Sequence, residues 1–279
     1  MARCEVCSRK CEIPEGKLGS CGARTCLDGA VRAANYGRIT ALQLDPVEKK
    51  PLRRFRPGSR ILSVGSYGCN LRCPFCQNNE ISWSGEALRE GARARTVTPE
   101  ELVRTAVRAR ERGNIGLAFT YNEPLVGWEF VLDAAREARR AGLVNVLVTN
   151  GTADLPVLDA VGPYMDAMNI DLKGFTKRYY RDILGGDLDM VKRFILRASG
   201  LCHVELTTLI VPGENDSEAE MAEMSRWIAE EVGPETPLHV SRFFPRFHMT
   251  DRAATDVRAV YRLAETARER LRYVYTGNC

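Results

Sequence analysis

The sequence predicts an α/β fold: a partial (β/α)6, TIM-like barrel preceded by a small cysteine-rich module that contains β-strands. Short apolar runs typical of buried strands recur about every 25–35 residues, which is the period of βα units. Segments with helical periodicity separate these runs, as expected for a parallel sheet with right-handed crossovers. In addition, five of the ten cysteines lie within the first 26 residues.

The first 26 residues are too short and too rich in turns to bury a core, so we expect a metal or cluster to organise them. Cys4, Cys7, Cys11 and Cys21 supply four thiolates with the spacing C-x2-C-x3-C-x9-C. Four thiolates can hold Zn(II) as a structural staple, or a fully ligated [4Fe–4S] cluster suited to electron delivery. The spacing does not distinguish these two. Cys26 is interpreted as a spare thiol.

A β-rich bridge is expected to follow this module. Residues 31–44 have the pattern of one or two strands with a glycine turn at Gly37. The segment 45–51 then contains two prolines, which interrupt regular structure. We therefore divide the chain into a cysteine-rich module with its bridge, residues 1–52, and a barrel core, residues 53–279.

The most informative segment follows a short strand predicted at 61–64. Cys69, Cys73 and Cys76 have the spacing C-x3-C-x2-C on the loop after that strand. Three thiolates can bind three corners of a [4Fe–4S] cluster, which leaves one iron without a protein ligand and open to a small molecule. A zinc knuckle is the alternative, but structural zinc sites usually have four protein ligands. We therefore predict a reactive iron–sulfur cluster at this loop.

The remaining elements alternate between helix and strand. A helix begins at Thr98, with Pro99 and Glu101 completing a start signal, and ends at Gly113. A second helix spans 128–141. The later strands are expected at 115–120, 144–148, 168–172, 204–210 and 238–241, with a last short strand at 273–275.

Polar residues follow these strands where purely structural loops would not need them. They are Asn122 and Glu123, Thr149 and Asn150, Asp171 and Lys173, the polar residues of 214–217, and Ser241 and Arg242. In a β/α barrel the carboxyl ends of the strands meet at one face, where active residues lie. Each signal alone is weak, since Asn150 with Gly151 is also a turn signal. Together they predict a ring of donors and acceptors around one cavity beside the cysteines.

With these motifs the chain resembles the radical S-adenosylmethionine (SAM) superfamily. That family has the C-x3-C-x2-C spacing with an aromatic residue before the last cysteine, here Phe75. Residues 121–124, Tyr-Asn-Glu-Pro, stand where the family has Gly-Gly-Glu-Pro. Within the superfamily, residues 149–151 and 171–173 resemble segments of pyruvate formate-lyase activating enzymes. Over the whole chain, the N-terminal cysteine motif and the segments 45–52 and 239–245 resemble the AmmeMemoRadiSam-system radical SAM enzymes.

This resemblance implies that the open iron chelates the amino and carboxylate groups of SAM. One electron would then break the S–C5′ bond and give a 5′-deoxyadenosyl radical. The resemblance also implies which residues bind the cofactor: Phe75, Asn122, Glu123, Thr149, Asn150, Asp171 and Lys173, with Glu123 toward the SAM ammonium and Lys173 toward its carboxylate. His239, beside Ser241 and Arg242, is a further candidate for a SAM or substrate contact. The alternative is that His239 is a hydrogen-bonded core histidine.

We therefore expect an enzyme whose radical abstracts hydrogen from an unidentified substrate, with a protein among the candidates. A glycyl-radical-enzyme activating enzyme is an alternative, although activating enzymes with added clusters carry them after the cluster motif rather than before it. A non-catalytic iron–sulfur electron carrier is a more distant alternative, because a carrier would not need the polar ring. The expected electron donor is a protein such as ferredoxin or flavodoxin.

Composition narrows the partners and the location. The net charge is only +4, and the arginines form no sustained basic stripe, which argues against nucleic-acid binding. The first ten residues lack the apolar segment of a secretion signal, and no apolar run is long enough to cross a bilayer. We therefore expect a cytoplasmic protein with no membrane partner, in a compartment where clustered cysteines hold metals. Cys202 is interpreted as a small core residue and Cys279 as a frayed terminal thiol.

Overall fold

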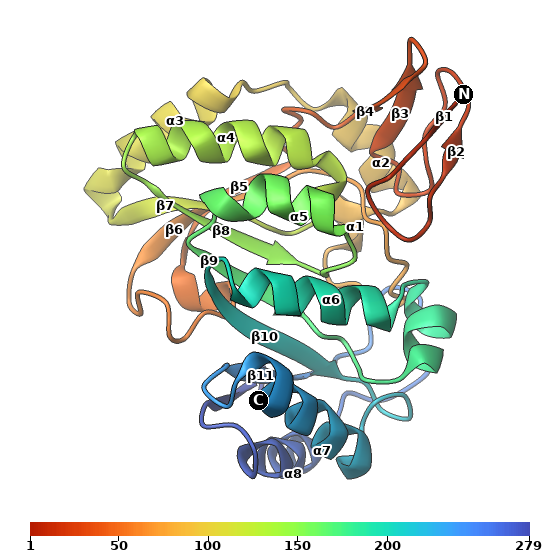
Figure 1. Cartoon of the computed structure of the whole chain (residues 1–279), viewed down its shortest axis with the longest axis vertical. Helices are drawn as coiled ribbons and strands as arrows, with labels where there is room; N and C mark the ends of the chain where they lie inside the picture. Colours follow the sequence, from red (N-terminus) through yellow and green to blue (C-terminus); the bar gives the residue numbers. More distant parts are fainter.

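The computed structural model describes residues 1–279. One curved eight-stranded sheet forms the body of the molecule, and helices cover its outer face (Figure 1). The strands are β5 (Ala41–Pro46), β6 (Arg60–Gly65), β7 (Asn114–Phe119), β8 (Val144–Thr149), β9 (Ala167–Asp171), β10 (His203–Ile210), β11 (Leu238–Arg242) and β12 (Val274–Gly277).

These strands lie in sequence order across the sheet, from β5 at one edge to β12 at the other. β5 is antiparallel to β6, and every later neighbour pair is parallel. The two edge strands are not paired with each other, so the barrel is open. Six βα units, β6 to α8, are followed by the final strand β12, and this arrangement confirms the predicted partial (β/α)6 barrel. The final strand, expected at 273–275, runs two residues further.

The helices that connect the strands are α1 (Asn79–Ser82), α2 (Gly85–Arg93), α3 (Pro99–Arg108), α4 (Trp128–Arg140), α5 (Leu155–Val161), α6 (Leu188–Ser199), α7 (Glu218–Trp227) and α8 (Val257–Arg268). Short helical turns occupy Val47–Lys49, Ala109–Arg112, Pro124–Gly127, Gly162–Tyr164, Tyr179–Leu184 and Ile228–Val232.

The helix predicted from Thr98 begins as expected. The Thr98 side chain accepts from the backbone N–H of Glu101, and the Glu101 carboxylate accepts from the backbone N–H of Thr98. This reciprocal pair satisfies two N–H groups that a helix start leaves unpaired. Gly113, with φ +84°, ends the helical segment. The apolar faces of the helices pack on the sheet in one core of 58 buried residues.

A plug formed by residues 47–56 closes the amino-terminal end of the barrel interior. Leu52 is fully buried, in a small apolar cluster with inward-facing residues of β6–β9. The backbone N–H groups of Arg53 and Arg54 donate to the Glu205 carboxylate of β10, at 3.0 and 2.7 Å. Asn169 of β9 donates through Nδ2 to the Pro51 carbonyl at 2.8 Å. The plug therefore closes this end of the barrel, and the cavity lies at the opposite end, where the strands have their carboxyl ends.

The cysteine-rich module consists of two small hairpins beside the sheet, β1 (Ala2–Arg3) with β2 (Glu12–Ile13) and β3 (Arg24–Leu27) with β4 (Ala30–Ala33). The buried Arg24 guanidinium binds the Glu129 carboxylate of α4, at 2.6 and 2.7 Å, and anchors this module to the barrel. β5 lies within residues 1–52 but forms the edge of the main sheet, so the predicted bridge supplies one of its eight strands. No helix is long and apolar enough to cross a bilayer.

Candidate functional site

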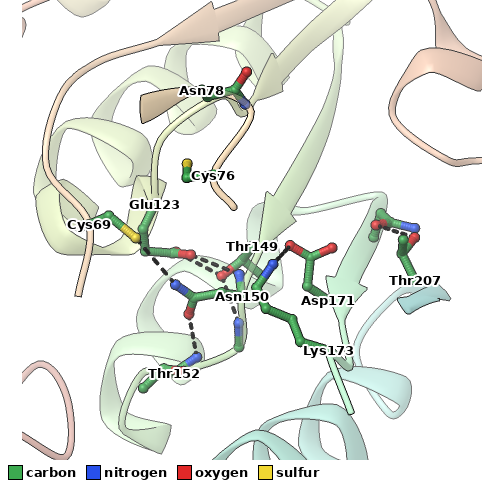
Figure 2. Close-up of polar contacts among 12 residues, drawn as sticks. Cys69, Cys76, Asn78, Glu123, Thr149, Asn150, Thr152, Asp171, Lys173 and Thr207 are labelled. Atoms are coloured by element: carbon green, nitrogen blue, oxygen red, sulfur yellow. Dashed lines mark hydrogen bonds and ion pairs between the residues drawn. The ribbon is translucent and has the colours of Figure 1, made fainter. Parts of the chain in front are cut away.

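A cavity of about 290 Å³ lies at the carboxyl ends of the parallel strands. Cys69, Cys73 and Cys76 line it from the loop between β6 and α1. Polar side chains line it from the ends of β7, β8 and β9, and Figure 2 shows Glu123, Thr149 and Asp171 among them. Three larger hollows lie on the outer surface, two of about 440 and 470 Å³ between β5 and α3 and one of about 320 Å³ between α7 and α8, and contain none of the predicted site residues.

Close packing fixes the backbone of the cysteine loop. Gly68 has φ +95°, and a Cβ there would lie 2.4 Å from the Cβ of Ala23, so only glycine fits. Arg72 then secures the loop, because its guanidinium donates to the carbonyls of Cys69 at 2.7 Å and Leu71 at 2.9 Å. The loop is therefore held in place before any ligand binds.

The three thiols differ in their surroundings. Burial raises the pKa of Cys73 to about 11, and burial also raises the pKa of Cys69 well above its usual value. Metal binding to such thiols displaces their protons, because the thiolate is the ligand. The Lys173 ammonium lowers the pKa of Cys73, because it favours the thiolate, and so opposes the effect of burial.

The donor set fits an iron–sulfur cluster better than a single ion. Structural zinc sites usually have four protein ligands. Cys69, Cys73 and Cys76 present three soft sulfur donors from one loop to one cavity, and three thiolates suit a [4Fe–4S] cluster that keeps one iron open.

Glu123 is a buried carboxylate without a cationic partner. Its Oε1 accepts from the Thr149 hydroxyl at 2.7 Å and the Leu125 N–H at 3.0 Å, and its Oε2 accepts from the Asn150 N–H at 2.8 Å. Burial raises the pKa of Glu123 to about 7, although these hydrogen bonds favour the charged form. Oε2 has one donor and can accept another. A ligand ammonium in the cavity would supply both that donor and the missing positive charge.

Tyr121 and Asn122 hold the loop that carries Glu123. Tyr121 has φ +73°, a conformation that favours glycine. Asn122 accepts from the Ser66 N–H at 3.0 Å and donates to the carbonyls of Tyr67 and Gly68 at 3.2 and 3.1 Å. The Asn122 side chain therefore fastens this loop to the end of β6, rather than presenting free polar atoms to a ligand.

Asp171 and Lys173 form an ion pair at the end of β9. Lys173 Nζ donates to Asp171 Oδ2 at 2.7 Å, and both side chains line the cavity (Figure 2). Burial lowers the pKa of Lys173, but the Asp171 charge and hydrogen bond, together with Cys73 and Tyr180, outweigh burial and keep the pKa well above its usual value. Lys173 is therefore a fixed positive charge facing the cavity, able to donate further hydrogen bonds.

Asn150 links the cysteine loop to the end of β8. Its Nδ2 lies 3.8 Å from Cys69 Sγ and donates to Asn70 Oδ1 at 2.9 Å, and its Oδ1 accepts from the Thr152 N–H at 2.8 Å. Phe75 is buried beside the cysteines and packs edge-on against Phe243, with 6.1 Å between the ring centres. Both residues were predicted from the sequence, and both line the cavity.

His239 is the one predicted cofactor contact that the structure does not bring to the cavity. It is the second residue of β11, and its Nε2 lies 2.7 Å from Glu205 Oε2, at the plug end of the barrel. Glu205 also contacts His203 and the backbone N–H groups of Arg53 and Arg54. Burial raises the pKa of Glu205, but these hydrogen bonds outweigh it and hold the value at about 2. His239 is thus the hydrogen-bonded core histidine of the alternative interpretation.

Ser241 of β11, expected in the polar ring, lines the cavity, whereas Thr207 of β10 and Asn278 after β12 also line it and were missed. Thr207 donates to Asn169 Oδ1 at 3.0 Å. A signal for Thr207 was available, because it occupies an inward-facing position of its strand. Trp83, after α1, also lines the cavity and was not recognised.

The four N-terminal cysteines also come together. Cys4, Cys7, Cys11 and Cys21 line one small cavity in the module. Cys26 does not line that cavity and donates to Glu15 at 3.3 Å. Cys202 is partly buried beside the core, and Cys279 is exposed at the end of the chain.

Comparisons with known proteins converge on one family. The sequence profile of the radical SAM superfamily matches residues 63–225. The chain is 38% identical to the protein MJ0808 of Methanocaldococcus jannaschii over 278 residues, which cover 99% of this chain and 81% of that protein.

Solved structures give the same fold. The crystal structure of Streptococcus suis SuiB bound to S-adenosylmethionine matches with a TM-score of 0.59 at 14% identity, over 78% of this chain and 52% of that one. A domain of the pyruvate-formate lyase-activating enzyme from Bacteroides vulgatus matches with a TM-score of 0.51 at 15% identity, over 58% of this chain and 99% of the domain. At these identities the likeness shows the fold alone.

Proposed function

This chain belongs to the radical SAM superfamily, and we propose that it is an enzyme that cleaves SAM reductively to act on a substrate. Membership implies a [4Fe–4S] cluster and SAM. Bound together, these cofactors would supply a 5′-deoxyadenosyl radical, which removes a hydrogen atom from the substrate. Cys69, Cys73 and Cys76 would hold the cluster, because they are the thiols that line the cavity at the strand ends.

The observation that carries this proposal is the buried carboxylate of Glu123, which faces the cavity without a counter-charge. A carboxylate in such a place is costly unless a cation joins it. The ammonium of SAM is a cation of the right kind, and Glu123 Oε2 has room for one more donor. Thr149, Asn150 and Leu125 hold the carboxylate in position through their hydrogen bonds.

Lys173 would bind the carboxylate of SAM. Its ammonium is already oriented by Asp171 at 2.7 Å and keeps donors that Asp171 does not use. Glu123 and Lys173 thus place one negative and one positive charge on the wall of the same cavity. That pattern is complementary to an amino acid group, whose ammonium and carboxylate carry the opposite charges.

Other residues would protect the site from water and side reactions. The plug formed by residues 47–56 closes the far end of the barrel and would keep solvent from reaching the cavity from that end. We further propose that electrons come from a ferredoxin- or flavodoxin-type protein. The substrate is unidentified. A protein substrate is a candidate, and SuiB, with the same fold, has been crystallised with its precursor peptide.

Release of 5′-deoxyadenosine tests the proposal. The full chain, reconstituted anaerobically with iron and sulfide, is incubated with SAM and dithionite, and the product is measured by mass spectrometry. We expect 5′-deoxyadenosine from the wild-type protein and from Cys279→Ala, a control that removes an exposed cysteine. Cys73→Ala should release none. A reconstituted wild-type protein that releases no 5′-deoxyadenosine would favour the electron-carrier alternative and contradict the proposal.

A further inference from the structure

The four cysteines of the N-terminal module form a second thiol site, separate from the cavity described above. Cys4 and Cys11 face each other across the β1–β2 hairpin, where the Cys4 N–H donates to the Cys11 carbonyl at 2.9 Å. Cys7 lies on the turn of that hairpin, and Cys21 comes from the segment before β3. All four line one enclosed cavity, whose other walls are mainly apolar.

The donor set limits the kind of metal centre. Four soft thiolates around one cavity can hold a single zinc ion or a fully ligated [4Fe–4S] cluster. Zinc has no redox chemistry, whereas a cluster can exchange single electrons with a neighbouring centre. The position of the module relative to the first site therefore decides between them.

Hydrogen-bond donors surround these sulfurs as well. The backbone N–H of Ala23 donates to Cys21 Sγ at 3.5 Å, and the Ser20 hydroxyl lies 3.3 Å from Cys11 Sγ. Donors directed at cluster sulfurs stabilise their negative charge and tune the reduction potential. Buried cysteines that only pack against apolar side chains would not need such hydrogen-bond donors.

The module touches the cysteine loop of the main cavity directly. The Cys69 N–H donates to the Cys21 carbonyl at 3.2 Å, so a ligand candidate of one site is bonded to a ligand candidate of the other. Gly68 packs against Ala23 so closely that no Cβ would fit. Arg72, which holds the Cys69 loop, also donates to the Ser20 carbonyl. A structural zinc ion could lie anywhere in the module. These contacts instead place the four-cysteine site directly against the Cys69 loop.

We propose that Cys4, Cys7, Cys11 and Cys21 hold a fully protein-ligated [4Fe–4S] cluster that relays single electrons to the group bound by the Cys69 loop. The role as a relay rests on the proposed function; the metal site itself does not. A ferredoxin- or flavodoxin-type donor supplies one electron to the N-terminal cluster. That cluster is then oxidised by one electron as the Cys69-bound group is reduced by one electron, and no proton or bond changes. The Cys21–Cys69 hydrogen bond provides the short path between them.

Metal content of the full chain tests the site. Wild-type protein, reconstituted anaerobically, should hold about eight irons from two four-iron clusters, and Cys69→Ala/Cys73→Ala/Cys76→Ala about four. After dithionite reduction that triple variant should still show the electron paramagnetic resonance (EPR) signal of a reduced [4Fe–4S] cluster. Cys7→Ser/Cys21→Ser should fall to about four irons, while Cys26→Ala, a matched cysteine outside the cavity, should match wild type.

Two results would overturn the inference. One is a triple variant that holds about one zinc and no iron, which identifies a structural zinc site. The other is a fully reduced wild-type EPR signal equal to the sum of the two variants' signals, because adjacent paramagnetic clusters broaden each other. The triple variant keeps the whole module, so folding failure of Cys7→Ser/Cys21→Ser does not affect it. Eight irons without SAM cleavage would instead contradict the proposed function alone.

Discussion

The hydroxyl of Tyr121 donates a 2.9 Å hydrogen bond to Asp45 Oδ2, which joins the loop after β7 to the edge strand β5. Asp45 also accepts from Lys50 Nζ at 2.9 Å and from the Ser63 hydroxyl at 3.0 Å. This buried network explains how a tyrosine occupies a left-handed backbone position where the family has glycine. The side chain is anchored at its far end, and Gly65 leaves room for it.

Tyr121→Phe should lower the free energy of unfolding by about 1–2 kcal/mol, because a buried carboxylate loses one donor while the ring stays packed. Tyr121→Gly should cost more, since the relief of backbone strain does not replace the lost packing. Urea unfolding of the anaerobic, metal-loaded protein measures both. Tyr261→Phe is the matched control, because Tyr261 is exposed on α8. Equal midpoints for Tyr121→Phe and the control would contradict the role of the network.

Asp45→Asn should destabilise the protein by about 3–5 kcal/mol, because it leaves the buried Lys50 ammonium unpaired. Asp45→Asn/Lys50→Met should be more stable than the single variant, since it removes both charges. Burial raises the pKa of Asp45, but Lys50, Tyr121 and Ser63 hold it at about 2. This stability is therefore present above the unfolded-state pKa and is lost as the pH falls toward 2. A single variant as stable as wild type at pH 7 would refute this account.

SAM binding should depend on pH through Glu123. Its pKa is raised to about 7, so the carboxyl is largely neutral below that pH and charged above it. Binding of the SAM ammonium requires the charged form, so affinity should rise as the pH goes from 6 to 7.5 and then level off. Anaerobic calorimetry checks this, with Glu90→Gln, an exposed carboxylate on α2, as control. Glu123→Gln should bind weakly with no such rise; a variant that keeps the wild-type pH profile would exclude Glu123.

Lys173→Met should weaken SAM binding by about 10–100-fold, the worth of a charge-assisted hydrogen bond to a carboxylate in a buried site. Lys177→Met is the matched control, because Lys177 pairs with Asp189 on the surface. The same calorimetry applies. If the two lysine variants bind SAM equally well, Lys173 has no role in holding the cofactor.

Much of the fold follows from local patterns. The βα period predicts the barrel, and residues after strand ends predict Glu123, Asp171 and Lys173, because parallel strands end at one face. The order of residues in the sequence does not reveal how deep inside the barrel a side chain lies. His239 and Ser241 point inward from the same strand, but His239 lies about 6.6 Å earlier along it and meets Glu205 at the plug.

The sequence also does not reveal contacts between residues that are far apart in the chain. The residue that anchors Tyr121 is Asp45, far back in a segment expected to be an irregular bridge. That segment includes the end of β5, where Pro46 is tolerated because β5 is an edge strand. The Cys21–Cys69 contact likewise depends on tertiary packing, which no spacing rule describes.

Hyperfine spectroscopy of the reduced protein tests the central claim, that an iron without a side-chain ligand binds SAM beside Glu123 and Lys173. The full chain is reduced with dithionite and mixed with SAM labelled with ¹⁵N at its amino group, and electron–nuclear double resonance is recorded. We predict a ¹⁵N coupling to the cluster in wild-type protein that is lost in Cys73→Ala. A reduced cluster that shows no ¹⁵N coupling while calorimetry shows bound SAM would contradict the account.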